Sequence, residues 1–148
     1  MTKQHKKWGI VALVVYGLLM LWLLFGQRWG NWARQWNLQL FDTVRRYLWV
    51  LRYSGSPALI RHAVINLAGN VIMFVPLGFL TPVAFPKLRR FLWHFAYMVL
   101  TILVVECLQL LTMLGSCDVD DLLLNAVGTT IGFALFRLSS KYLCKGGA

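Results

Sequence analysis

Acidic side chains are scarce in this sequence, and most of them lie in one short stretch. Of the five acidic residues in the 148-residue chain, four lie between Glu106 and Asp121. Carboxylates gathered in this way can exchange protons with a substrate, accept hydrogen bonds or bind a divalent cation. The stretch is therefore the first candidate for a functional site, and Glu106, Asp118 and Asp121 are its candidate catalytic residues.

Amide side chains recur at helical spacing near these acids. Asn66 and Asn70 are four residues apart, and Glu106 and Gln109 are three apart, so each pair shares one face of a helix. A third face continues from the acids in steps of three and four residues: Asp118, Asp121, Asn125, Gly128 and Gly132. The candidate ligand-binding residues all carry an amide group: Asn66, Asn70, Gln109 and Asn125.

The segments that carry these residues are apolar and long. Hydrophobic residues make up 59% of the chain and the mean hydropathy is +0.63. A soluble domain of this size could not bury so much apolar surface, whereas lipid is a suitable solvent for it. We therefore expect an all-α polytopic membrane protein with a single domain over 1–148 and about four transmembrane helices, at roughly 8–25, 62–80, 91–113 and 120–137.

The segment that follows the first apolar run is basic and aromatic. Apolar residues recur there at steps of three or four: Trp32, Trp36, Leu40, Val44, Tyr47 and Leu51. Tryptophan with arginine is typical of a helix at headgroup level, where its basic side chains favour anionic lipid; packing on neighbouring helices explains the same stripe. We expect an amphipathic interfacial helix over 31–53, followed by a break at Ser54–Pro57.

Basic residues between the apolar runs predict the orientation in the membrane. They cluster at both ends of the chain and in one short loop: Lys3, Lys6, Lys7, Lys87, Arg89, Arg90, Arg137, Lys141 and Lys145. By the positive-inside rule both termini are expected in the cytoplasm and the Gly115–Asp121 turn outside. Six arginines within 28–61 would then also lie outside, which counts against this orientation. Charge interspersed among membrane segments argues against nucleic acid as a partner.

Depth along the helices adds a second argument for a site. Asn70, Glu106 and Asn125 each lie seven or eight residues from the outer end of a predicted helix, or roughly 10–12 Å. A carboxylate at that depth is costly unless it is paired, protonated or hydrated, so Glu106 is a functional candidate. Burial and neighbouring acids favour its protonated form, which can donate a hydrogen bond or a proton.

A purely structural explanation competes with the functional one. Asparagine and glutamine hydrogen-bond between membrane helices, and small residues such as Gly69, Gly128 and Gly132 allow close approach. Asp118 is also suited to cap a helix whose first turn would contain Asp120 and Asp121. This explanation accounts for the amides but gives no reason for an acid at position 106.

Metal and nucleophile chemistry have weaker support. The acids offer oxygen ligands for Mg²⁺ or Ca²⁺, but adjacent residues on a helix diverge by about 100°, and no EF-hand spacing is present. We therefore predict no metal and no cofactor. Ser116 and Cys117 have no histidine near them in sequence, with His62 the one candidate from another segment. The three cysteines show no zinc-type spacing.

Three motifs, in order, resemble the VanZ-like family, which is named for a teicoplanin-resistance protein. They are N-x-x-G-N-x-x-x-F-x-P-L-G-F from Asn66, E-x-x-Q from Glu106 and G-S-C-D-V-D-D-x-x-x-N-x-x-G-x-x-x-G from Gly115. The resemblance runs from about 37 to 137. It implies that the family's polar positions fall on residues of this chain at Asn66, Asn70, Glu106, Gln109, Asp118, Asp121 and Asn125. An arginine that many members carry before the acidic motif is absent here.

The resemblance implies a bacterial cell-membrane protein, linked in some members to lowered glycopeptide susceptibility, but it supplies no reaction. We expect an outward-facing acid and amide site that binds or modifies a cell-wall or lipid-linked component, and we leave open whether the protein is an enzyme. The alternatives are a non-enzymatic subunit beside an envelope synthase or transporter, and a small proton-coupled carrier. The expected partners are the lipid bilayer, a lipid-linked precursor or another envelope protein, and the chain could form oligomers.

Overall fold

The structure, a computed structural model, describes residues 3–26, 35–112 and 116–145. Four helices in these ranges are long and apolar enough to cross a membrane: Lys3–Gly26, Pro57–Ala84, Phe91–Thr112 and Val119–Ser140. Many of their large apolar side chains are exposed, as is expected where lipid rather than water surrounds a helix. The prediction of an all-α membrane protein with four spanning helices is confirmed.

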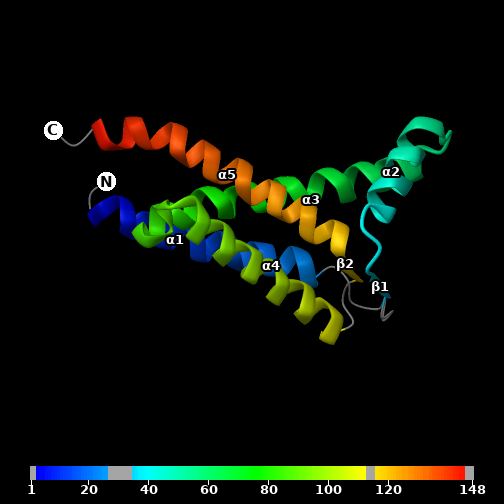
Figure 1. Ribbon diagram of the computed structural model, residues 1–148, viewed down its shortest axis with the longest axis horizontal. Coiled ribbons are helices and arrows are strands. Elements are labelled where there is room, and N and C mark those ends of the chain that lie inside the picture. The colour runs from blue at the N-terminus through cyan, green and yellow to red at the C-terminus, as the bar shows by residue number, and fades with distance from the viewer. Residues whose placement is uncertain (1–2, 27–34, 113–115, 146–148) are drawn as a thin grey trace.

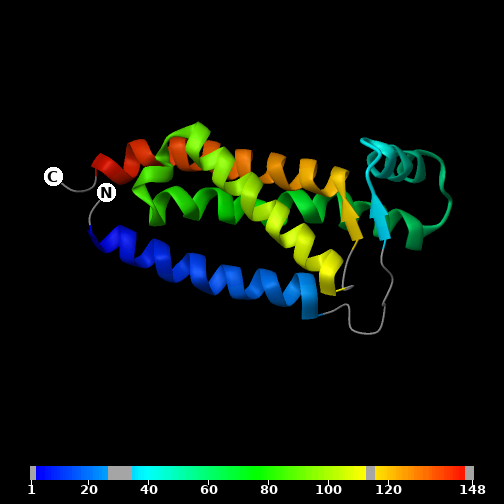
Figure 2. The same cartoon turned by 60° about the horizontal axis from the view of Figure 1, so that its bottom comes forward.

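The elements run up and down between two ends of the molecule. In chain order they are α1 (Lys3–Leu21), the π-helical turn η1 (Trp22–Gly26), β1 (Gln35–Asn37), α2 (Asp42–Tyr53), α3 (Pro57–Ala84), the 3-10 turn η2 (Pro86–Arg89), α4 (Phe91–Thr112), β2 (Ser116–Asp118) and α5 (Val119–Lys145). The start of α1, the connection from α3 to α4 and the end of α5 lie at one end, which we name the basic end (Figure 1). The two strands, α2 and the start of α5 lie at the other, which we name the acidic end (Figure 2).

The closest helix contact joins α3 to α5 through glycines. A Cβ atom at Gly128 would overlap the carbonyl oxygen of Val71, and one at Gly132 would overlap that of Val75. From the other side, Gly78 leaves room for the backbone of Thr129. Without side chains at these positions the two backbones meet directly, which is how small-xxx-small motifs stabilise helix pairs in lipid. The expected role of Gly69 is wrong, because it faces open space.

A buried apolar cluster connects the four spanning helices. Its members come from α1 and η1, α3, α4 and α5: Met20, Leu24, Phe74, Leu77, Met98, Ile102, Val105 and Ala126. α1 packs along α3, where the Tyr16 hydroxyl donates a 2.7 Å hydrogen bond to the Met73 carbonyl. This bond lies next to the Ile72 carbonyl, which loses its helical donor because residue 76 is proline.

Helix α3 is longer than its hydropathy indicated. The expected span ends near residue 80, but the helix continues to Ala84 and contains two prolines, Pro76 and Pro82. A final bond from the Phe85 N–H to the Thr81 carbonyl, at 2.8 Å, closes its last turn. Proline is tolerated in a membrane helix where neighbouring groups satisfy the freed carbonyl.

The expected helix over 31–53 is wrong in its first part. Gln35–Asn37 forms a short strand, and only Asp42–Tyr53 is helical; residues 31–34 lie outside the described ranges. Phe41 precedes the helix with φ 63°, a conformation that is rare without glycine. The described helix is amphipathic: Val44 and Tyr47 are half-buried, Tyr47 packs on His62 of α3, and the arginines are exposed. The break after Tyr53 lies where the Ser-Gly-Ser-Pro signal predicts it.

The α3–α5 contact gives a matched test. Gly128→Ala should destabilise the protein by about 1–3 kcal/mol, because the added methyl would push apart two backbones that cannot move cheaply. Gly69→Ala should leave stability unchanged or slightly raised, since nothing lies near that position. The midpoint of thermal unfolding in detergent measures both. Equal midpoints for the two variants would show that the helices do not meet at Gly128.

Candidate functional site

The two short strands bring distant parts of the chain together at the acidic end. β1 and β2 pair in parallel, with Asn37 opposite Asp118. The segment before α2 is thereby held against the start of α5, which follows β2 directly. The carboxylates that open α5 consequently lie beside the first turn of α2, although about 75 residues of sequence separate them.

Asp118 is buried and uses both of its oxygens within the protein. Its Oδ1 accepts a 2.9 Å hydrogen bond from the Asp120 N–H, which makes it the cap of α5. Its Oδ2 accepts from the Thr43 hydroxyl at 2.6 Å and from the Asn37 amide at 3.5 Å. The same amide donates to the Thr43 oxygen at 2.9 Å. Asp118 therefore joins β1, α2 and α5.

Asp120 is completely buried and caps a different helix from its own. Its Oδ1 accepts from the Phe41 N–H at 2.6 Å, and its Oδ2 accepts from the Val44 N–H at 3.0 Å. Phe41 is the N-cap residue of α2 and Val44 lies in its first turn, where the N–H groups have no helical partners and the helix dipole favours an anion. These bonds also offset the strain of the left-handed Phe41 backbone.

Asp121 faces the helix bundle from the same turn of α5. It is half-buried and accepts a short hydrogen bond from the Asn70 amide of α3. The pairing of an acid with an amide across two spanning helices agrees with the sequence, which places both on inward faces. Within the acidic end, Asp121 is thus the carboxylate that points toward α3 rather than toward α2.

Three polar side chains lie deeper, among the spanning helices. Glu106 and Gln109 of α4 are 4% and 6% exposed, and Asn125 of α5 is 3% exposed. Their sequence neighbours Val105 and Ala126 both belong to the apolar cluster that connects the spanning helices, so these polar residues are buried beside that cluster. Asn125 Oδ1 accepts no hydrogen bond from the described part of the chain. Buried acceptors of this kind need a donor, so the interior is suited to a group that supplies one.

Asn66 does not join this arrangement. Its amide donates to the carbonyl of His62, one turn earlier on α3, at 2.9 Å. The ring of His62 packs edge-on against Tyr47 of α2, with 5.8 Å between the ring centroids. The structure therefore brings Asn70, but not Asn66, into hydrogen-bond contact with the acids at the start of α5.

The arrangement favours hydrogen bonding over metal binding. Among the described residues, no group of three or more histidine, cysteine, aspartate and glutamate side chains is placed to hold a metal ion. Both oxygens of Asp118 and of Asp120 already accept hydrogen bonds from the protein. Cys107 is an exposed free thiol on the outside of α4.

Sequence reasoning missed Thr43 and Asp120 as members of the site. The signal for Thr43 was weak, because a single hydroxyl in a basic segment is common. The signal for Asp120 was present in D-V-D-D: a capping residue at Asp118 leaves the carboxylate two positions later free to serve another helix. What the sequence could not show is that the start of α2 would be that helix.

The fold and the site define a multi-pass membrane protein with a hydrogen-bonded acidic end. The sequence profile of the VanZ/LLP1 family matches residues 12–140, so the chain belongs to that family. Protein VanZ of Enterococcus faecium is 29% identical over 136 residues, covering 91% of this chain and 76% of that protein. No solved structure matches significantly.

Removal of the Asp120 charge should loosen α2. In Asp120→Asn one of the two capping bonds must be lost, because an amide nitrogen would face a backbone N–H, at a cost of about 1–3 kcal/mol. Trypsin should then cleave after Arg45 and Arg46 roughly tenfold faster, since cleavage follows the population of the opened helix. The rate of appearance of these fragments measures the effect.

The control for this experiment is Asp42→Asn. Asp42 lies in the first turn of α2, the turn that Asp120 caps, but its side chain forms a surface ion pair with Arg46. Such a pair contributes little to stability. Cleavage at the wild-type rate in both variants would mean that Asp120 does not hold α2.

Proposed function

We propose that this protein binds an envelope component that carries hydroxyl or amide groups on a lipid anchor, at a site formed by Glu106, Gln109 and Asn125 beneath the acidic end. Occupation of this site lowers the access of glycopeptide antibiotics such as teicoplanin to their target. Membership of the VanZ/LLP1 family and the similarity to Protein VanZ support this general role.

One observation carries the proposal: α4 and α5 bury a carboxyl and two amide side chains among apolar helices. Interhelical packing alone has no need for a carboxyl group there, and burial of one is costly in lipid. Asn125 Oδ1, which accepts no hydrogen bond from the described residues, is an acceptor suited to a ligand hydroxyl or amide. Glu106 in its protonated form would donate to the same ligand.

The basic helix α2, at the acidic end, supports a lipid-linked ligand. Asp120 caps α2 and so holds it over the acidic end, where Arg45 and Arg52 are exposed. Exposed Leu48 and Trp49 alternate with these arginines, as in helices that lie at the headgroup level of a bilayer. A phosphate-bearing lipid carrier would meet these arginines while its attached group reaches the interior site.

The contacts favour binding over catalysis for two of the acids. Asp118 joins β1, α2 and α5, and both of its carboxylate oxygens already accept hydrogen bonds from the protein. Asp120 is committed to the first turn of α2 in the same way. We therefore assign both a positioning role and keep Glu106, together with the Asp121–Asn70 pair, for contact with the ligand.

This function needs the acidic end outside the cell membrane and both termini in the cytoplasm. Single cysteines at Tyr53 (acidic end) and Lys87 (basic end), in a chain whose three native cysteines are serine, test this orientation. In intact cells a membrane-impermeant maleimide should label Tyr53→Cys, and it should label Lys87→Cys only after permeabilisation. The reverse pattern would place the site on the cytoplasmic side and exclude the proposal.

The function itself is tested by teicoplanin susceptibility of a sensitive Gram-positive host. Wild type should raise the minimal inhibitory concentration, and Glu106→Gln should return it to that of the empty vector, because glutamine keeps the shape but lacks the acidic proton. Asp121→Asn should give partial loss, since its bond with Asn70 is weakened rather than removed.

Asp42→Asn is the matched control, because it removes a carboxylate that is exposed and outside the site. Membrane levels and unfolding midpoints of all variants must agree with wild type. Full protection by Glu106→Gln would show that the acid is structural, and no protection by wild type would refute the glycopeptide role.

A further inference from the structure

A row of polar side chains lies along one face of α3 at the acidic end. His62, Asn66 and Asn70 follow one another at intervals of four residues, so they share a face and span roughly 12 Å along the helix. We name these three residues the polar row. Burial increases inward along it, because His62 is exposed whereas Asn66 and Asn70 are half-buried. The row therefore extends from the surface into the helix bundle.

Contacts with two other helices determine where the row begins and ends. At its outer end the ring of His62 packs edge-on against Tyr47 of α2, with 5.8 Å between the ring centroids. At its inner end the Asn70 amide donates a hydrogen bond to the carboxylate of Asp121 on α5. The row thus begins between α2 and α3 and ends between α3 and α5.

Asn66, in the middle of the row, presents a hydrogen-bond acceptor. Its amide nitrogen donates to the His62 carbonyl at 2.9 Å, which holds the side chain in one orientation. Among the residues that the structure describes, none donates to its amide oxygen. A half-buried amide oxygen of this kind is suited to accept a hydrogen bond from a ligand hydroxyl or N–H group.

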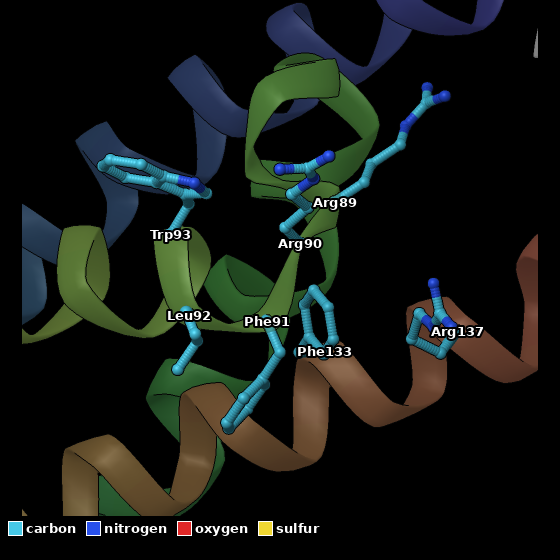
Figure 3. Close-up of a pocket in the computed structure, with 7 residues that line it drawn as sticks. All are labelled: Arg89, Arg90, Phe91, Leu92, Trp93, Phe133 and Arg137. Atoms are coloured by element: carbon cyan, nitrogen blue, oxygen red, sulfur yellow. The ribbon is translucent and has the colours of Figure 1, made fainter.

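The row contains neither lysine nor arginine, in contrast to the open cavity of about 460 Å³ at the basic end. Three of the residues that line that cavity are Arg89, Arg90 and Arg137, and none of them is an amide or an acid (Figure 3). At the inner end of the polar row the carboxylate of Asp121 accepts hydrogen bonds, so it favours a ligand group that donates them. Hydroxyl and amide groups can donate, whereas an ionised phosphate has no hydrogen to donate. The row is therefore suited to a neutral headgroup.

A saccharide matches both the length and the chemistry of the row. A single hydroxyl group can occupy only one position along roughly 12 Å of helix, whereas a sugar carries several hydroxyl groups at different positions. Aromatic rings such as those of Tyr47 and His62 can also pack against the C–H groups of a sugar ring.

We propose that the polar row binds the saccharide headgroup of a lipid-linked sugar, while the phosphate of the lipid carrier contacts the arginines of α2. This inference rests on the function proposed above, because it names the headgroup of the same ligand. The row reaches that site through the Asn70–Asp121 pair, which the proposed function assigns to ligand contact.

Native mass spectrometry of the purified, delipidated protein tests this proposal with two probes of equal charge. One is a polyprenyl phosphate esterified with N-acetylglucosamine, and the other is the same polyprenyl phosphate esterified with methanol. The sugar ester should bind at least roughly tenfold more tightly, because it adds several hydrogen bonds. Equal binding of the two probes would overturn the saccharide inference and leave the proposed function standing. Binding of neither probe would refute both.

Asn66→Ala should weaken binding of the sugar ester by roughly threefold to tenfold and leave binding of the methyl ester unchanged. The Asn66 side chain bonds to its own helix, so the variant should keep the wild-type unfolding midpoint. The control is Gln39→Ala, which removes an exposed amide at the same end but outside the row, and it should bind both probes as wild type does. Equal weakening by the two variants, or equal weakening of both probes by Asn66→Ala, would overturn the assignment of the sugar to the row.

Discussion

Direct backbone contact between α3 and α5 is the constraint on which the acidic end depends. Lipid gives no hydrophobic drive for helix association, so the pair must gain its stability from close packing at Gly78, Gly128 and Gly132. That contact sets the distance between the helices and so allows Asn70 to reach Asp121. The start of α5, placed in this way, then presents its remaining acids to the first turn of α2.

The carboxylates of one helix turn serve three different neighbours. Asp118 faces β1 and Thr43, Asp120 faces the N–H groups of α2, and Asp121 faces α3. Successive residues on a helix diverge by about 100°, so a run of acids at a helix start can hold several elements at once. The same divergence keeps these acids from converging on one cation, and it leaves the deeper polar residues of α4 and α5 as a separate group.

The sequence predicted what local properties determine and missed what depends on pairing between distant segments. Hydropathy found the four spanning helices, and helical spacing placed Asn70 and Asp121 on inward faces, because both signals are carried by neighbouring residues. The strand at Gln35–Asn37 exists through its pairing with Ser116–Asp118, which no local pattern records. Asn66 is the opposite case: its spacing is suitable for a contact between helices, but its amide donates to the His62 carbonyl of its own helix. The expected helix ends near residue 80, whereas α3 continues past Pro82, whose carbonyl accepts a hydrogen bond from Arg89.

The small number of acidic residues also determines how charge is distributed between the two ends of the molecule. The chain has five acids against fifteen basic residues, and the carboxylates of β2 and α5 are all engaged at the acidic end. Asp118 and Asp120 bond to the start of α2, and Asp121 bonds to Asn70 of α3. At the acidic end the arginines of α2 remain exposed even though acids lie below them, because those acids bind backbone and amide groups instead. Both ends thus carry exposed arginine, whereas the buried carboxyl of Glu106 belongs to the interior between them.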